Sequence, residues 1–107
     1  MSRAPIAPVR VVITDDSDIV TSQLSRVLGS AEGIEIVGIA HSIRELHDLV
    51  RTKRPDVVTL DLLLPVSTGV SSIGPLSQKS KVIIVSDLGE ASPLAAEALA
   101  RGASAYV

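Results

Sequence analysis

Two hydrophobic patterns alternate along the chain, and together they predict alternating strands and helices. Short runs rich in β-branched residues are long enough for strands and too short for helices; they cover residues 9–13, 34–40, 56–61, 81–86 and 103–107. Between them, apolar residues recur at helical spacing. On the two longer helices the predicted inward residues are Ile19, Val20, Gln23, Leu24, Val27 and Leu28, then Ile43, Leu46, Leu49 and Val50.

Capping and breaking residues mark the helix ends. Ser42 with Glu45 three residues later is a capping-box signature, and Gly29 predicts the end of the preceding helix. Residues 70–79 predict a helix that Gly74-Pro75 breaks, leaving it short and irregular. The last predicted helix follows Ser92-Pro93, and its inward residues are expected to be Leu94, Ala95, Ala98 and Leu99.

Strands that are apolar on both faces and alternate with helices indicate an α/β fold. Such strands form a parallel sheet covered by helices on both sides, connected by right-handed crossovers. We expect one domain over residues 9–107, preceded by a flexible arm at 1–8 that contains Pro5 and Pro8.

Composition narrows the classes of function. The chain has 107 residues, a net charge of −2 and no cysteine. The absence of cysteine excludes thiolate zinc sites and disulfides, and the net charge of −2 gives no indication of nucleic-acid binding. The chain also lacks a membrane-length apolar run or a signal peptide, which favours a cytoplasmic domain without direct membrane or nucleic-acid contacts.

Polar residues follow three of the predicted strands. Asp15-Asp16 follows the first, Asp61 the third and Ser86-Asp87 the fourth. Because the carboxyl ends of parallel strands share one edge, these side chains should converge there. Two carboxylates ~4 Å apart repel by roughly 4 kcal/mol at an effective dielectric near 20. A proton or a hard cation must relieve this, and oxygen ligands suit Mg²⁺.

Each of these residues also has a simpler interpretation. Asp15-Asp16 after a strand is a common helix N-cap, Asp61 is a plausible capping carboxylate, and Ser86 a loop hydroxyl. Their occurrence together on three strands favours a site. A carboxylate beside Mg²⁺ can also attack phosphorus and form an aspartyl-phosphate.

Four segments in this order resemble a bacterial response-regulator receiver domain, and the resemblance covers residues 9–107. The segments are 11–17 (VVITDDS), 55–65 (PDVVTLDLLLP) with Gly69, 82–86 (VIIVS) and 102–107 (GASAYV). VVTLDLLLP is similar to receivers of chemotaxis methylesterases, and GASAYV to those of LuxR-type regulators. The resemblance implies a flavodoxin-like five-stranded sheet of order 2-1-3-4-5, with the family's last helix missing from this chain.

The resemblance also implies roles for individual residues. Asp61 would be the phospho-acceptor, and Asp15, Asp16, Asp61 and the Leu63 carbonyl would hold Mg²⁺. Ser86 would contact the phosphoryl group, and Tyr106 would swing inward as the switch aromatic. The domain would be a regulatory acceptor rather than an enzyme.

The implied partners are a sensor histidine kinase and either an output domain in cis or a protein on the face formed by strands four and five. The uncovered sheet edge would also allow two copies to associate as a dimer.

Two alternatives stay open at this point. Asp87 beside Ser86, and the absence of the family's lysine after strand five, suit a pseudo-receiver that binds partners without phosphate. Asp16-Ser17-Asp18 is similar to the Asp-x-Asp of haloacid-dehalogenase-type phosphatases.

Two smaller features have structural interpretations. His41 and His47 are expected to be structural and solvated, respectively. The basic cluster Arg51, Lys53 and Arg54 is interpreted as charge at a helix end.

Overall fold

The computed structural model describes residues 7–61, 69–85 and 93–107, with the backbone alone at 69–72, 94–95 and 106. Nine elements follow one another in these ranges. They are β1 (Val9–Thr14), α1 (Asp18–Gly29), β2 (Ile34–Ala40), α2 (Ile43–Lys53), β3 (Val57–Leu60), α3 (Gly69–Ser77), β4 (Lys81–Ile84), α4 (Pro93–Ala100) and β5 (Ala105–Tyr106).

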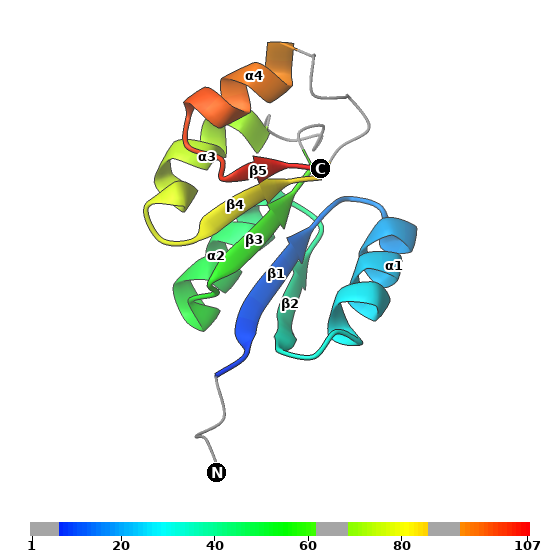
Figure 1. Cartoon of the computed structure of the whole chain (residues 1–107). Coiled ribbons are helices and arrows are strands. Elements are labelled where there is room, and N and C mark those ends of the chain that lie inside the picture. The colour runs from blue at the N-terminus through cyan, green and yellow to red at the C-terminus, as the bar shows by residue number, and fades with distance from the viewer. Residues whose placement is uncertain (1–6, 62–68, 86–92) are drawn as a thin grey trace.

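The five strands form one parallel sheet of order β2-β1-β3-β4-β5 (Figure 1), which confirms the predicted class and order. β1 lies in the interior of the sheet and pairs with both β2 and β3. All strands run in one direction, so their carboxyl ends share one edge. No helix follows β5 among the described residues.

One face of the sheet is fully covered. Alternate residues of β1, β3 and β4, including Val12, Val58 and Ile84, point toward α2, α3 and α4 and are buried. Leu46 of α2 and Ile73 of α3 are likewise completely buried against them. This layer is the main hydrophobic core, and it holds the strands in register.

Among the described residues, α1 is the helix that covers the opposite face (Figure 1). Between α1 and the sheet lies an apolar groove of about 330 Å³. Its lining includes Leu24 and Leu28 of α1, Val11 of β1 and Ile83 of β4. Thr59 of β3 also lines it, and the buried hydroxyl of this residue has no hydrogen-bond partner within the described parts of the chain.

The predicted inward faces of α1 and α4 are partly wrong. Thr21 is the residue that α1 buries, whereas Ile19 is 71% and Val27 62% exposed. On α4, Ala98 is buried and Leu99 is 46% exposed. Successive residues of a helix are rotated by about 100° around its axis. When Thr21 faces the sheet, Ile19 and Val27 therefore point away from it, and Leu99 likewise points away when Ala98 is buried. The side chains of residues 94 and 95 lie outside the description.

The predicted break at Gly74-Pro75 is also wrong, because α3 continues through Pro75 to Ser77. Proline removes one backbone N–H, and so near a helix end it costs a single hydrogen bond. The Ser77 hydroxyl donates to the Gly74 carbonyl at 2.9 Å, and the helix ends there.

The start signal of α2 agrees with the structure, and α4 begins at Pro93 as expected, whereas Ser92 lies outside the described residues. Ser42 is the N-cap of α2 and its hydroxyl accepts from the Glu45 N–H at 3.1 Å. His47 is exposed, as expected. No helix among the described residues is both long and apolar enough to cross a membrane.

Candidate functional site

Two neighbouring strand ends carry the acidic residues. Asp15 and Asp16 follow β1 directly, and Asp61 follows β3 directly. The register pairs Thr14 with Leu60, and the Asp61 N–H donates to the Thr14 carbonyl at 3.2 Å. The strand ends are therefore locked side by side, and the carboxylates that follow them must be close.

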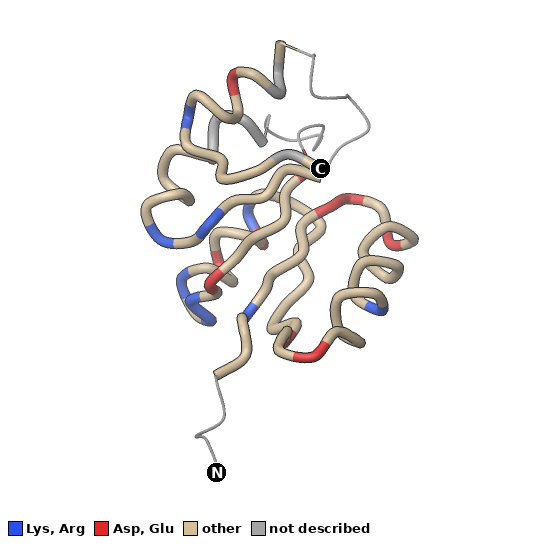
Figure 2. The backbone as a smooth tube through the Cα atoms, in the orientation of Figure 1, with Lys and Arg blue, Asp and Glu red and all other residues tan. Residues whose placement is uncertain are grey.

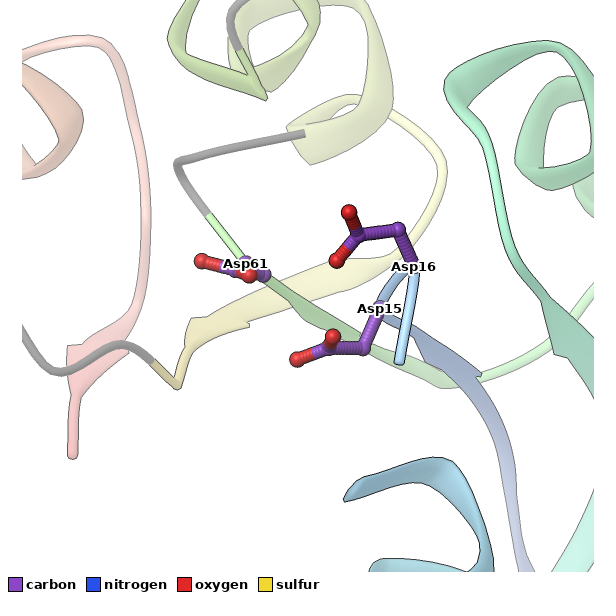
Figure 3. Close-up of side chains that lie close together, drawn as sticks. All are labelled: Asp15, Asp16 and Asp61. Atoms are coloured by element: carbon purple, nitrogen blue, oxygen red, sulfur yellow. The ribbon is translucent and has the colours of Figure 1, made fainter. Parts of the chain in front are cut away.

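The three carboxylates do converge at the carboxyl end of the sheet. Each offers an oxygen that lies within 4.8 Å of an oxygen of the other two. Figure 3 shows Asp15, Asp16 and Asp61 directed toward a common space from two strand ends. Asp15 is buried, Asp61 half-buried and Asp16 exposed, so the cluster opens to solvent on one side.

Asp15 is held in place by the turn that starts α1. The Ser17 N–H donates to Asp15 Oδ1 at 2.9 Å, while the Ser17 hydroxyl accepts from the Val20 N–H at 3.3 Å. Ser17 is therefore the N-cap of α1, and the interpretation of Asp15-Asp16 as the cap is wrong. Ser17 is a positioning residue that the sequence analysis did not single out, although a serine before helical spacing is a common cap signal.

Full ionisation of all three carboxylates is electrostatically unfavourable in this cluster. Burial raises the pKa of the Asp15 carboxyl above its ordinary value, and the nearby Asp61 and Asp16 raise it further. The hydrogen bond from the Ser17 N–H acts in the opposite direction but does not cancel these effects. A bound proton or a cation therefore stabilises this arrangement.

The donor set fits a hard divalent cation. It consists of three carboxylates, with no imidazole within the cluster. Mg²⁺ prefers one or two carboxylates together with other oxygen ligands, so the chemistry of the residues suits it. His41 follows β2 at the same edge of the sheet. Its Nε2 lies 2.9 Å from Asp18 Oδ1, so this imidazole contacts Asp18 and is not part of the carboxylate cluster.

The other predicted site residues are not placed. Leu63, Ser86 and Asp87 lie outside the described residues. For Tyr106 the backbone is described, as part of β5 and paired with Ile84, whereas its side chain is not. The structure thus brings together the three aspartates, and the roles of the other residues stay predictions.

Comparison with known proteins gives one consistent result. The family profile described as response regulator receiver domain matches residues 11–107. A protein-glutamate methylesterase/protein-glutamine glutaminase of Myxococcus xanthus is 40% identical over 92% of this chain and 29% of its own length. The chain spans less than half the length of the first curated relatives it matches.

Two solved structures are similar to the whole fold. The receiver domain of a putative NarL response regulator from Mycobacterium tuberculosis has a TM-score of 0.86 at 25% identity, over 94% of this chain and 83% of that one. A protein in the CheX-CheY-BeF3-Mg²⁺ complex from Borrelia burgdorferi has a TM-score of 0.81 at 29% identity, over 94% and 78%.

Proposed function

Since the chain belongs to the response regulator receiver family, we propose that it is a phosphorylation-dependent switch whose Asp61 accepts a phosphoryl group. Receivers are regulatory modules of two-component systems, and we infer that this domain acts in the cytoplasm without being an enzyme itself. The observation that carries the proposal is the meeting of Asp15, Asp16 and Asp61, from two strand ends, within 4.8 Å.

The donor would be the phosphohistidine of a sensor kinase. An Asp61 carboxylate oxygen attacks phosphorus, and the bond from phosphorus to the imidazole nitrogen breaks with its electron pair remaining on the histidine. An acyl phosphate on Asp61 is formed. Asp61 suits this role because it is fixed to β1 through its own N–H and is only half-buried, beside the exposed Asp16.

Asp15 and Asp16 would hold Mg²⁺ together with Asp61 and the Leu63 carbonyl. The cation would offset the negative charge that builds up when a phosphoryl group approaches three carboxylates. The raised pKa of Asp15 supports this division of roles, because a buried carboxyl with two acidic neighbours gains most from a cation.

The output of the switch would involve the end of the sheet near β4 and β5. We propose that Ser86 contacts the phosphoryl group and that Tyr106 reports its presence by moving inward. Support comes from their positions in the sequence: Ser86 follows β4 by two residues, and Tyr106 pairs with Ile84 of the same strand. An output domain or partner protein would then bind this face.

The proposal is tested by incubating the chain with acetyl phosphate and Mg²⁺ and measuring intact mass. We expect a phosphoryl adduct that maps to Asp61, requires Mg²⁺ and is absent in Asp61→Asn. Asp18→Asn is the matched control, because this nearby carboxylate is 90% exposed and lies outside the cluster. It should retain the adduct, and circular dichroism should show both variants folded.

Other outcomes would contradict the proposal in distinguishable ways. An adduct that persists in Asp61→Asn would place the acceptor elsewhere. A folded wild-type chain without any adduct would favour the phosphate-independent pseudo-receiver. Steady release of phosphate from varied monoesters would favour a phosphatase.

A further inference from the structure

A second hollow lies at the amino end of the sheet, where the strands begin. It has a volume of about 400 Å³ and is formed between the last turn of α2 and the turn before β4. Three long basic side chains, Arg51, Arg54 and Lys79, line it together with Ser80 and the largely buried Val50. This hollow is far along the strands from the aspartates, which follow their carboxyl ends.

The two walls of the hollow are joined by hydrogen bonds. The hydroxyl of Ser80, which is 6% exposed, donates to the Pro55 carbonyl at 2.8 Å and ties the turn before β4 to the segment after α2. The guanidinium of Arg10 donates to the carbonyls of Lys53 and Arg54. The basic side chains that line the hollow therefore project from a fixed frame.

Positive charge accumulates around this frame. Figure 2 shows basic segments gathered at this end of the molecule. Six of the ten basic residues of the chain lie at this end of the sheet, against the four acidic residues Glu32, Glu35, Asp48 and Asp56; the six are Arg10, Arg51, Lys53, Arg54, Lys79 and Lys81.

Two of the cations at the hollow are uncompensated. Arg51 forms an ion pair with Asp48 at 3.1 Å, but Arg54 and Lys79 have no ion pair within the described residues. Arg54 also adopts a left-handed backbone with a φ of 49°, a conformation that favours glycine. Arg54 thus places a long charged side chain at a position whose backbone glycine would adopt with less strain.

The donors that remain at the hollow indicate the chemistry of a ligand. The Arg54 N–H donates to the Val50 carbonyl at 3.1 Å, and the N–H groups of Lys79 and Ser80 both donate to Leu76 at 2.9 Å. Backbone N–H groups that would cradle a compact phosphate are therefore already occupied. What remains is a set of separate, flexible cations on long side chains, which suits carboxylates spaced along an extended chain.

Nucleotides fit this hollow poorly. Base recognition relies on aromatic stacking, and the chain has one aromatic residue, Tyr106, which lies in β5 rather than here.

We propose that this basic hollow binds an acidic peptide segment of a partner protein, with carboxylates paired to Arg54 and Lys79 and the peptide lying across Val50. The site does not depend on phosphorylation of Asp61, because it is formed by different elements at the opposite end of the sheet. Guanidinium groups recognise carboxylates through two parallel hydrogen bonds, so Arg54 would contribute specificity as well as charge.

The test measures binding of a fluorescein-labelled peptide of alternating aspartate and glutamate by anisotropy at low salt. The double variant Arg54→Gln/Lys79→Gln should weaken binding by at least about fivefold. The control Arg26→Gln/Arg44→Gln removes the same charge from exposed positions away from the hollow and should change affinity by less than about twofold.

Three outcomes would overturn the proposal. Equal losses in the two double variants would mean that net charge alone attracts the peptide. Stronger binding of inorganic polyphosphate than of the acidic peptide, lost in Arg54→Gln/Lys79→Gln, would assign the hollow to phosphate. Failure of the wild-type chain to bind the peptide, with circular dichroism showing it folded, would mean that the hollow is not a binding site.

Discussion

At the carboxyl end of the sheet, three short acidic side chains lie within 4.8 Å of one another, and one of them is buried. At the amino end, six long basic side chains are spread over three elements and the connecting turns, and most are exposed. Arginine and lysine can bend away from one another into solvent, so crowding them costs little. Aspartates on fixed strand ends cannot move apart, and their repulsion remains in the folded protein.

The two proposed sites therefore differ in how rigidly their charged groups are held. The carboxyl end is a rigid cluster whose stability depends on what neutralises it, as a divalent cation site requires. The amino end is an adjustable surface whose charge is tolerated without a ligand. Changes at the first end should therefore alter folding stability strongly, and changes at the second should mainly alter binding.

The largest predicted effect is stabilisation by Mg²⁺. A cation present at a hundred times its Kd raises the free energy of unfolding by about 2.7 kcal/mol. Asp16→Asn should lose most of this gain, because it removes the exposed ligand of the cluster while leaving the buried one. Urea unfolding of the wild type and of Asp16→Asn, each with and without Mg²⁺, measures this gain in the free energy of unfolding. An undiminished gain in Asp16→Asn would show that Mg²⁺ binds elsewhere.

The next effect is stabilisation of the metal-free protein by Asp15→Asn, by on the order of 1 kcal/mol at neutral pH. Asparagine removes a buried charge that Asp16 and Asp61 both repel, and its side-chain oxygen can still accept from the Ser17 N–H. With saturating Mg²⁺ the wild type should be more stable than Asp15→Asn, because the variant lacks one carboxylate ligand for the cation. Greater stability of the wild type without metal would contradict the account.

The same residue predicts a pH dependence. The pKa of Asp15 is raised in the folded state, so the folded protein retains this proton at pH values where the unfolded chain has lost it. The contribution of Asp15 to the free energy of unfolding is therefore largest at low pH. It falls as the pH rises from the pKa of an unfolded aspartate through the raised pKa of the folded state. Unfolding curves of wild type and Asp15→Asn, measured without metal, should converge below that window and separate above it.

The smallest effect is expected at the amino end. Arg54→Gln/Lys79→Gln should change the free energy of unfolding by less than about 0.5 kcal/mol, because exposed cations without ion pairs contribute little. Chemical denaturation checks this. A loss of unfolding free energy as large as that expected from Mg²⁺ removal would show that Arg54 and Lys79 stabilise the fold and do not mainly serve binding.

Local signals predicted the parallel sheet and the acidic cluster, because both follow from such signals with fixed consequences, whereas the strand order was implied by the resemblance to receiver domains. A β-branched run that ends in aspartate places that aspartate at the carboxyl edge of a parallel sheet, whatever the details of packing. The register between Thr14 and Leu60 then brings Asp15 and Asp61 together.

Helix orientation was harder to predict. Ile19 and Val27 were expected to point inward because they are apolar, yet α1 is oriented so that Thr21 is buried and these two residues are exposed. The basic hollow was also missed, because it joins the end of α2 to Lys79 and Ser80, which are distant in sequence. Only tertiary packing brings these segments together, and no local pattern marks the contact.

The most direct test of the central claim is paramagnetic broadening by Mn²⁺, which replaces Mg²⁺ at oxygen sites. Substoichiometric Mn²⁺ should broaden the side-chain carboxyl resonances of Asp15, Asp16 and Asp61 together, before those of any other acidic residue, and excess Mg²⁺ should restore them. Broadening that begins at Asp48 or Asp56, or that spares Asp61, would contradict a shared cation at the carboxyl end of the sheet.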